Sequence, residues 1–478
     1  MQCRLSCSAV LSILLAPAFA VAGEAPQYRA VFDAATKSMR VQACLHEAHA
    51  RVSFAADSAW AKRFVADVAR ESGGSLTTEE NGWSAKDWRA GECLSYRADL
   101  AAIAAEDQSD VGWRSGEDLV AAPQLWLLRA DVQEDAAQIR VELPSGWSIS
   151  APWQALPRDG NGTGIKSTVF RIAQTPADWS AAVALGHFVE KRIELPGGVL
   201  RLSILGSVDT AQRDKLEHWF GRVARAVLGA YGRLPLADVQ VLMLPVDGRG
   251  HAVVFGQSVR GQGNALHLLI DPSRPEAEFD DDWMAVHELS HLMHPYLGDR
   301  GSWLAEGLAT YYQNVLRARG GLLTAAQAWD RLSEGFQRGA RTKDDEGLEQ
   351  TAADMHRTHA FQRVYWAGAA FWLRVDRDLR RESGGKVGLD TALSRFRECC
   401  LPAYRQWRPE DFVAKLDALA GSALISARYR EFAAMRTFPD WHSLYADLGI
   451  SETGGRMSFD EKARDAPIRE AIMRAKAD

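Results

Sequence analysis

The chain has 478 residues, of which 47% are hydrophobic and 25% are charged, and its formal net charge is −6. This length is enough for two or three domains. The ordinary apolar content, which includes 16 tryptophans, excludes collagen-like, disordered and coiled-coil proteins. The slightly acidic balance provides no broad cationic surface for nucleic acid or anionic lipid. We therefore expect no nucleic-acid partner and a function that depends on a local site.

Residues 1–22 have the pattern of a secretory signal peptide. One charge, Arg4, precedes an apolar stretch through Leu15, and small residues follow up to Ala22. An uncleaved membrane anchor is the alternative, but the segment is short for a span and contains Pro17. No other uncharged stretch approaches the length of a membrane helix. We expect an exported protein, periplasmic or secreted, with no integral membrane span after signal cleavage.

Four cysteines remain after the signal peptide, and export permits them to oxidise. Cys44 and Cys93 both lie in strand-like sequence, which favours a structural bridge between them. Cys399 and Cys400 are adjacent and lack the C-x-x-C spacing of redox motifs, so we interpret them as structural or free thiols. The sequence alone leaves the pairing open, and it gives no indication of the oligomeric state.

Three segments follow the signal peptide. Residues 23–196 contain short alternating apolar runs broken by turn residues, which predicts an N-terminal antiparallel β domain, with one helix-like stretch at 58–70. The run Pro196-Gly197-Gly198 marks a change of pattern. Residues 197–320 mix strands and helices, and residues 321–478 are helical. The order predicts a multidomain α+β protein in which a β domain precedes a two-lobed α+β unit that ends in a helical region. In the last two segments we expect strands near 199–204, 239–244, 252–256 and 265–270, and helices near 210–230, 303–318, 324–338, 361–382, 389–398 and 409–417.

The segment 280–295 contains an H-E-x-x-H motif and is predicted to form one helix, with three acids at its start and Pro295 at its end. His287 and His291 are four residues apart, so both project from one face and can bind a single zinc ion. Glu288 flanks that face, where it can hydrogen-bond a metal-bound water without being a ligand.

A second helix is expected to supply the third ligand. The loop after Pro295 contains the glycines that a reversal needs, and Ser302 is a good N-cap. If the two helices pack antiparallel, Glu306 lies beside the histidines, which makes an open catalytic zinc site. His294 is the alternative ligand, but it would lie about 10 Å along a straight helix from His287, so we interpret it as an orienting or packing residue.

The motif and the following run Trp303-Leu-Ala-Glu306-Gly-Leu-Ala-Thr-Tyr-Tyr resemble the gluzincin metallopeptidases, in particular the glycyl aminopeptidase family, and more distantly the aminopeptidase N enzymes. The resemblance implies a thermolysin-like catalytic unit with one Zn²⁺ per chain. A further stretch, Tyr365-Trp-Ala-Gly368, is similar to a Tyr-x-x-Gly helix of these enzymes. By that resemblance the Tyr365 hydroxyl would donate a hydrogen bond to the oxyanion, although an ordinary core aromatic is the alternative.

One stretch departs from the aminopeptidase N pattern. Those enzymes carry a Gly-x-Met-Glu-Asn strand whose Glu binds the free amino group of the substrate. The corresponding segment 260–270 has no acid before Asp271. We expect its backbone around Gly261, Gly263 and Asn264 to bind an extended peptide as an added strand.

These features predict an exported zinc metallopeptidase, either an aminopeptidase or an endopeptidase, that acts on peptides or proteins. Zinc would lower the pKa of its water and polarise the scissile carbonyl, and Glu288 would act as general base. Two alternatives stay open: a catalytically silent zinc-containing scaffold or binding protein, and a hydrolase on the same scaffold that cleaves a non-peptide bond.

Overall fold

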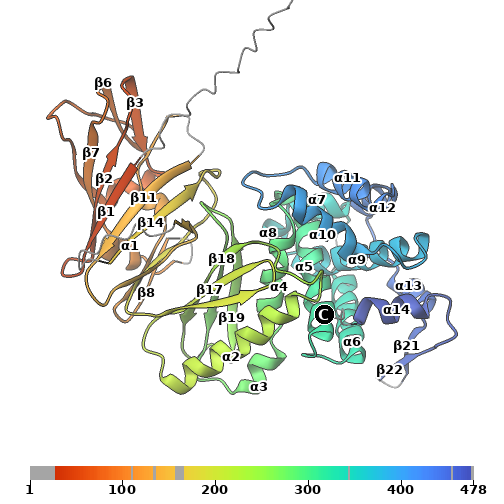
Figure 1. Cartoon of the computed structure of the whole chain (residues 1–478). Coiled ribbons are helices and arrows are strands. Elements are labelled where there is room, and N and C mark those ends of the chain that lie inside the picture. The colour runs from red at the N-terminus through yellow and green to blue at the C-terminus, as the bar shows by residue number, and fades with distance from the viewer. Residues whose placement is uncertain are drawn as a thin grey trace, which may run out of the picture.

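The computed structural model describes residues 27–108, 111–132, 136–156, 166–342, 345–453 and 456–474. The predicted signal peptide, residues 1–22, lies outside the described residues. Within the described part of the chain, no helix is both long and apolar enough to cross a membrane. Figure 1 shows a β domain at one end, a central sheet flanked by helices, and a helical region at the other end. The predicted multidomain α+β fold is therefore confirmed.

The N-terminal domain contains a seven-stranded sheet and two four-stranded sheets around a shared hydrophobic core. Its strands are mainly antiparallel, but β1 also pairs in parallel with β11. The seven-stranded sheet has the order β13-β14-β11-β1-β2-β7-β4, with β1 Gln27–Asp33, β2 Ser38–Cys44, β4 Val65–Arg70, β7 Cys93–Asp99, β11 Ala136–Leu143, β13 Gln154–Ala155 and β14 Lys166–Ala173. The smaller sheets contain β3 His49–Ala55, β5 Thr77–Thr78, β6 Gly82–Trp88 and β10 Arg129–Ala130, and β8 Gly112–Ser115, β9 Asp118–Ala121, β12 Ser148–Ser150 and β15 Val183–Gly186. One short helix, α1 Leu100–Ala104, follows β7.

The stretch 58–70, which reads as a helix in the sequence, is divided between a short 3₁₀ helix and a strand. A short 3₁₀ helix covers Ala59–Arg63, and β4 then pairs antiparallel with β7 across an irregularity between Ala66 and Ala69. The helix prediction was wrong for Val65–Arg70 because a partner strand that is distant in sequence supplies the hydrogen bonds, and pairing of this kind overrides weak local propensity.

Both cysteine pairs of the described chain are bonded. Cys44 and Cys93 occupy directly opposite positions on β2 and β7 and form a disulfide, as the sequence suggested. Cys399 and Cys400 form a second disulfide between neighbouring residues at the end of α10. These two residues are therefore not free thiols.

The central sheet leads toward the H-E-x-x-H motif and has the order β16-β17-β18-β20-β19. Its strands are β16 Glu190–Leu195, β17 Gly198–Ile204, β18 Asp238–Pro245, β19 Val253–Val259 and β20 Ala265–Ile270. Pro196 and Gly197 connect β16 to β17, which are paired antiparallel. The sheet therefore begins at Glu190, before the domain boundary that was expected at residues 196 and 197.

Strand β18 shows why this sheet is buried on both faces. Val241 and Met243 enter the core that includes α2, whereas Leu242 and Leu244 pack with residues of the N-terminal domain. Since alternate residues of a strand face opposite sides, a nearly continuous apolar run is required. Gln240, the buried polar residue of this strand, donates to the carbonyl oxygen of Ala182 at 3.2 Å.

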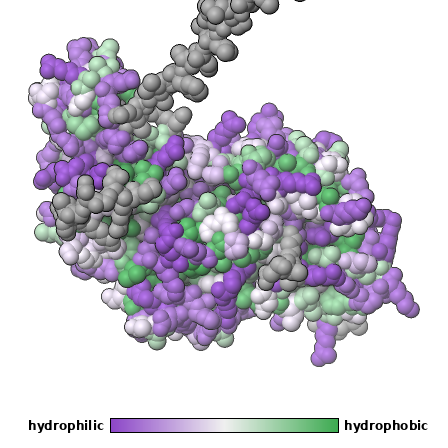
Figure 2. Space-filling view, in the orientation of Figure 1, coloured by the Kyte–Doolittle hydropathy of each residue, from purple (hydrophilic) through white to green (hydrophobic). Residues whose placement is uncertain are grey.

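Helices surround the zinc-binding motif and complete the molecule. α2 Thr210–Val227 lies against the central sheet and begins with a capping box between Asp209 and Gln212. The other helices are α3 Glu276–Asp281, α4 Met284–Ser290, α5 Ser302–Arg319, α6 Ala325–Arg341, α7 Leu348–Ala353, α8 Met355–Thr358, α9 Phe361–Glu382, α10 Leu389–Cys400, α11 Pro409–Ala420, α12 Leu424–Ala433, α13 Trp441–Asp447 and α14 Ala466–Met473, and a hairpin of β21 Ile450–Thr453 and β22 Arg456–Phe459 precedes α14. One hydrophobic core runs from the central sheet through these helices. Hydrophilic residues cover much of the face shown in Figure 2, with small hydrophobic groups between them.

Candidate metal centre

The motif begins on α4, a short buried helix that packs against α2, β19 and α5, and its second histidine opens the 3₁₀ helix His291–Met293 that follows directly. The single helix expected over residues 280–295 is divided, because the backbone is extended at Asp282 between α3 and α4. The Asp282 carboxylate accepts hydrogen bonds from the backbone N–H groups of Met284 at 2.9 Å and Ala285 at 3.3 Å. One acid therefore satisfies two of the backbone N–H groups that the N-terminus of the motif helix leaves free.

The structure brings His287, His291 and Glu306 together. The two histidine Nε2 atoms are 3.2 Å apart, and Oε2 of Glu306 lies 3.2 Å from one and 3.5 Å from the other. Zinc bonds of about 2.0–2.1 Å place the ligands of a tetrahedral ion about 3.3 Å apart. The three atoms thus form a triangle of the size that one zinc ion requires. Burial raises the pKa of Glu306, but the neighbouring imidazoles outweigh it, so the net pKa lies below the ordinary value and the carboxylate is ionised.

The far nitrogen of each imidazole is hydrogen-bonded, which leaves Nε2 available for a metal. Nδ1 of His287 lies 2.8 Å from Oε1 of Gln313, and Nδ1 of His291 lies 3.1 Å from Nε2 of His294. Nδ1 of His294 lies 2.7 Å from the carbonyl oxygen of Pro295, which can only accept. We assign Nδ1–H donors throughout, and partners of this kind orient metal ligands.

His294 has the orienting role that the sequence suggested, because it accepts from His291 and does not join the triangle. Burial, and then the charge of Arg260, hold its pKa well below the ordinary value, so the ring is neutral and can accept this hydrogen bond. Gln313 was missed. It lies seven residues after Glu306 on α5, so both residues face the motif, but this signal has meaning only once the antiparallel packing of α4 and α5 is known.

Glu288 is buried between α4 and β19. It offers an oxygen within 4.8 Å of imidazole nitrogens of His287 and His291. A side chain at Gly256 on β19 would come within 2.9 Å of the Glu288 Cγ atom, and the Ser258 hydroxyl donates to the Glu288 carbonyl oxygen. Glu306, and not Glu288, completes the triangle with the two histidine Nε2 atoms. Glu288 lies beside this triangle and is available for a role other than metal ligand.

Arg260, which the sequence analysis did not single out, is a partly buried cation at the end of the motif helix. Its Nη2 donates to the carbonyl oxygens of His291 at 2.6 Å and His294 at 3.3 Å. Burial lowers its pKa to about 10 against the opposing effect of Glu288 and Glu306, so the guanidinium is charged at neutral pH. A cation at this position is favourable because carbonyl groups at the helix C-terminus carry partial negative charge.

Tyr365 reaches the same centre from α9. Its ring stacks on His287 with centroids 6.0 Å apart and an interplanar angle of 13°. Burial and then the Glu306 charge raise the pKa of Tyr365, so the phenol keeps its proton and can donate. α9 approaches this closely because Gly307 of α5 and Gly368 of α9 face each other, and a side chain at either position would overlap the other helix.

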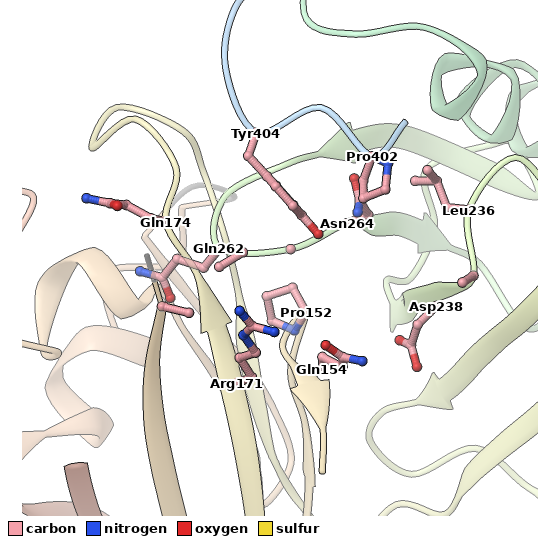
Figure 3. A pocket seen from close by; sticks show the side chains of 14 residues that line it. Pro152, Gln154, Arg171, Gln174, Leu236, Asp238, Gln262, Asn264, Pro402 and Tyr404 are labelled. Carbon is pink, nitrogen blue, oxygen red and sulfur yellow. The ribbon is translucent and has the colours of Figure 1, made fainter. Parts of the chain in front are cut away.

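The glycines predicted to bind substrate lie where two domains meet. A side chain at Gly261 would overlap the carbonyl oxygens of Trp179 and Ser180, and one at Gly263 would overlap the carbonyl oxygen of Pro152. Gly263 and Asn264 also line a cavity of about 450 Å³ between the N-terminal domain and the catalytic region. In Figure 3, Tyr404 and Pro402 approach this cavity from one side and Arg171 and Gln154 from the other. A substrate role for Gly261, Gly263 and Asn264 stays a prediction.

The fold and the clustered side chains are similar to those of gluzincin-type zinc metallopeptidases. Residues 285–370, from α4 into α9, match the M61 glycyl aminopeptidase family. A search of curated proteins finds no match.

Solved structures share the architecture along most of the chain. An aminopeptidase N family protein from Idiomarina loihiensis has a TM-score of 0.68 at 14% identity, with 89% of this chain and 78% of that protein covered. An M1 zinc metallopeptidase from Deinococcus radiodurans has a TM-score of 0.53 at 16% identity, with coverages of 87% and 94%. A variant of the Deinococcus enzyme bound to a Tyr-Ser-Ala substrate has a TM-score of 0.52 at 15% identity, with coverages of 87% and 95%. At these identities the likeness establishes the shared fold.

Proposed function

We propose that the protein is an exported zinc metallopeptidase that hydrolyses peptide bonds with one zinc ion per chain, bound by His287, His291 and Glu306. The observation that carries the proposal is the triangle of 3.2, 3.2 and 3.5 Å among their three donor atoms, with both far imidazole nitrogens already hydrogen-bonded. Two nitrogens and one carboxylate form an open catalytic donor set. A structural zinc site would instead be closed by a fourth protein ligand.

Each residue around the triangle has a separate role in the hydrolysis. When bound, zinc supplies Lewis-acid polarisation and a water of lowered pKa. The Glu288 carboxylate takes a proton from the attacking water and delivers it to the leaving amine. The Tyr365 phenol donates a hydrogen bond to the oxyanion that develops on the scissile carbonyl. Arg260 and His294 hold the motif helix and the His291 ring in place.

Strand β19 offers a place for the peptide backbone. It is the last strand in the order of the central sheet, and it passes over Glu288 at Gly256 and Ser258. An extended peptide can pair with such an edge as an added strand. The Deinococcus variant was solved with Tyr-Ser-Ala, which makes short peptides the first substrates to examine for this chain.

Two kinds of cleavage are compatible with this site. The match to glycyl aminopeptidases favours removal of N-terminal residues. On β19 and the residue after it, however, the positions next to the motif helix are Gly256, Ser258 and Arg260, which provide no carboxylate for a free α-ammonium group. This second observation favours cleavage that does not require a free N-terminus.

A mixed peptide library with free and acetylated N-termini tests the proposal. The zinc-loaded protein is expected to cleave peptides, to lose that activity with a chelator and to regain it when zinc is restored. Cleavage of free peptides only would establish an aminopeptidase, and cleavage of both sets an endopeptidase. Zinc binding without any peptide cleavage would contradict the proposal. It would favour the two alternative functions, a zinc-containing scaffold or binding protein and a hydrolase that cleaves a non-peptide bond.

Export is part of the proposal. The N-terminal pattern of residues 1–22 supports it, and so do the two disulfides, because such bonds are rare in the reducing cytosol. Fractionation of the native host should recover the mature chain outside the cytoplasm, with a new N-terminus after Ala20 or Ala22. Recovery of the full-length chain in the cytoplasm would contradict this part.

A further inference from the structure

A second feature of the catalytic region is a cavity of about 320 Å³ beside the metal centre. Trp283 and Tyr365 line it, and both also contact the His287 ring, at centroid distances of 5.4 and 6.0 Å. The cavity therefore begins where a substrate would leave the zinc triangle. Residues of α5, α6 and α9 form the rest of its wall.

The charged groups on this wall are predominantly cationic. Arg317 of α5 and Arg331 and Arg338 of α6 line the cavity together with one acid, Glu334. Arg331 forms an ion pair with Asp281. Arg338 lies over the Trp366 ring at 5.1 Å, and its Nη1 is 3.9 Å from Glu334, so this guanidinium is only loosely paired.

Arg317 is the most unusual of the three, because its side chain is completely buried. Nη2 donates to the Asp281 carbonyl oxygen at 2.7 Å and lies 3.7 Å from the Asp281 carboxylate. Its other two nitrogens, Nε and Nη1, have no acceptor among the described residues. Burial, and then the charge of Arg331, lower its pKa to about 10, so Arg317 is still a cation at neutral pH. Buried donors without acceptors are costly. An anion in the cavity would stabilise this uncompensated charge through its proximity, although the Arg317 guanidinium has no exposed surface of its own.

We propose that this cavity binds a carboxylate of the substrate, supplied by an acidic side chain or by the C-terminus of the peptide. This inference rests on the proposed peptidase function. A carboxylate is the anion that peptides carry, and a guanidinium matches it with paired hydrogen bonds. The aromatic rings of Trp283, Phe361 and Trp366 provide apolar surface for the rest of the side chain.

The spacing along α5 fits this role. Arg317 lies three turns after Glu306, about 16 Å along the helix axis. An extended peptide advances about 3.3 Å per residue, so the recognised carboxylate lies up to about five residues from the scissile bond. The cavity lies on the side of the metal centre formed by His287 and Tyr365, whereas β19 passes over Glu288. The carboxylate that the cavity binds therefore belongs to the part of the peptide that extends away from β19.

The test uses peptides in which a single Glu or Gln is moved through the positions on both sides of the cleaved bond, each with a free or an amidated C-terminus. The wild-type enzyme should cleave the best Glu peptide, or the free-acid form, with a kcat/KM at least about tenfold above its neutral counterpart. A side-chain effect and a C-terminal effect identify the two possible sources of the carboxylate. Equal kcat/KM for acidic and neutral peptides at every position would overturn the inference, while cleavage itself would leave the proposed function intact.

Variants on α6 connect the preference to the cavity. Arg338→Gln should reduce the acid-to-neutral ratio about threefold or more, whereas Glu334→Gln should raise it, because it removes the one opposing charge. Arg341→Gln is the matched control, since Arg341 is exposed on the same helix and does not line the cavity. An unchanged ratio in Arg338→Gln, or an equal change in Arg341→Gln, would overturn the assignment.

A binding measurement keeps the inference testable if no peptide is cleaved. Calorimetric titration of zinc-loaded Glu288→Gln with the Glu and Gln versions of one peptide should show tighter binding of the acid, and equal affinities would overturn the inference.

Discussion

Arg70 in the β domain and Arg317 in the catalytic region are both buried, and their surroundings differ. Arg70 forms two parallel hydrogen bonds with Glu92, at 2.8 and 2.7 Å, and also donates to the carbonyl oxygens of Lys86 and Asp87. Each of its three nitrogens therefore has an acceptor. Arg317 has an acceptor for only one nitrogen within the described chain.

The difference separates polar groups that stabilise the fold from those that are available to a ligand. The Arg70–Glu92 pair is closed, since its partners come from neighbouring strands and turns. The zinc triangle resembles Arg317 because some of its polar atoms have no partner within the protein. The Nδ1 atom of each imidazole is hydrogen-bonded, but the three donor atoms of the triangle point toward one another with no protein group between them. We therefore expect substitutions in the closed pair to reduce stability and substitutions in the open centre to reduce metal binding or turnover.

The largest expected effect comes from Glu306→Ala, which removes one donor atom of the triangle. Loss of partners that merely orient metal ligands weakens metal affinity by about 10–100-fold, so loss of a ligand should cost at least about 100-fold. Zinc affinity can be measured by competition with a chromogenic chelator, and folding by circular dichroism.

Glu398→Ala is the control for this substitution, because Glu398 is exposed on α10. It should retain full zinc affinity. If Glu306→Ala bound zinc as tightly as the wild type, Glu306 would not be a ligand. The assignment of the triangle as the zinc site would then be wrong.

Tyr365→Phe sharpens the comparison inside the open centre, since it removes one hydroxyl and keeps the ring that stacks on His287. The loss of an oxyanion donor should reduce kcat by about 100-fold to 1,000-fold, with zinc content and stability unchanged. Tyr404→Phe removes the same group in the interdomain cavity and should have no effect on kcat. Equal kcat values for Tyr365→Phe and the wild type would make Tyr365 a core aromatic.

Glu92→Gln breaks the closed pair and should destabilise the β domain by about 3 kcal/mol, because Arg70 is then left buried without its anion. The hydrogen bond from Arg70 lowers the pKa of Glu92 to about 2. A carboxyl group with a lowered native pKa contributes stability above its unfolded pKa of about 4.3 and loses it as the pH falls toward 2. Urea unfolding at pH 7 and pH 3 should therefore show a larger acid loss for the wild type than for Glu92→Gln.

Glu142→Gln is the matched control, because Glu142 makes the same paired contact with Arg29, whose side chain is 55% exposed. It should change the free energy of unfolding by less than about 1 kcal/mol. A similar cost for both substitutions would show that burial does not distinguish the two pairs.

The sequence predicted the elements whose signals are local. The H-E-x-x-H spacing placed His287 and His291 on one face, and the apolar pattern predicted α9 over residues 361–382. Glu306 was found because it lies on the next helix along the chain. The central strands were found because their apolar runs are nearly continuous.

The rest depends on contacts between distant segments. Gln313 and Arg260 become part of the centre only when α5 and the end of β19 pack against α4. In the sequence, the arginines of α5 and α6 cannot be distinguished from other charged residues on helices. They line a common cavity only because α9 packs beside α5 and α6. The strand at Val65–Arg70 forms because of β7, and the break at Asp282 divides an otherwise helical pattern. Local propensity contains none of this information.

The most direct test of the open centre is the turnover of Glu288→Gln at a zinc content equal to that of the wild type. The variant keeps the size of the side chain but cannot take the proton from the attacking water. We predict that kcat for peptide hydrolysis falls by about 100-fold to 10,000-fold while zinc binding and the unfolding midpoint stay unchanged. A fully zinc-loaded Glu288→Gln protein that cleaves peptides at the wild-type rate would contradict the account.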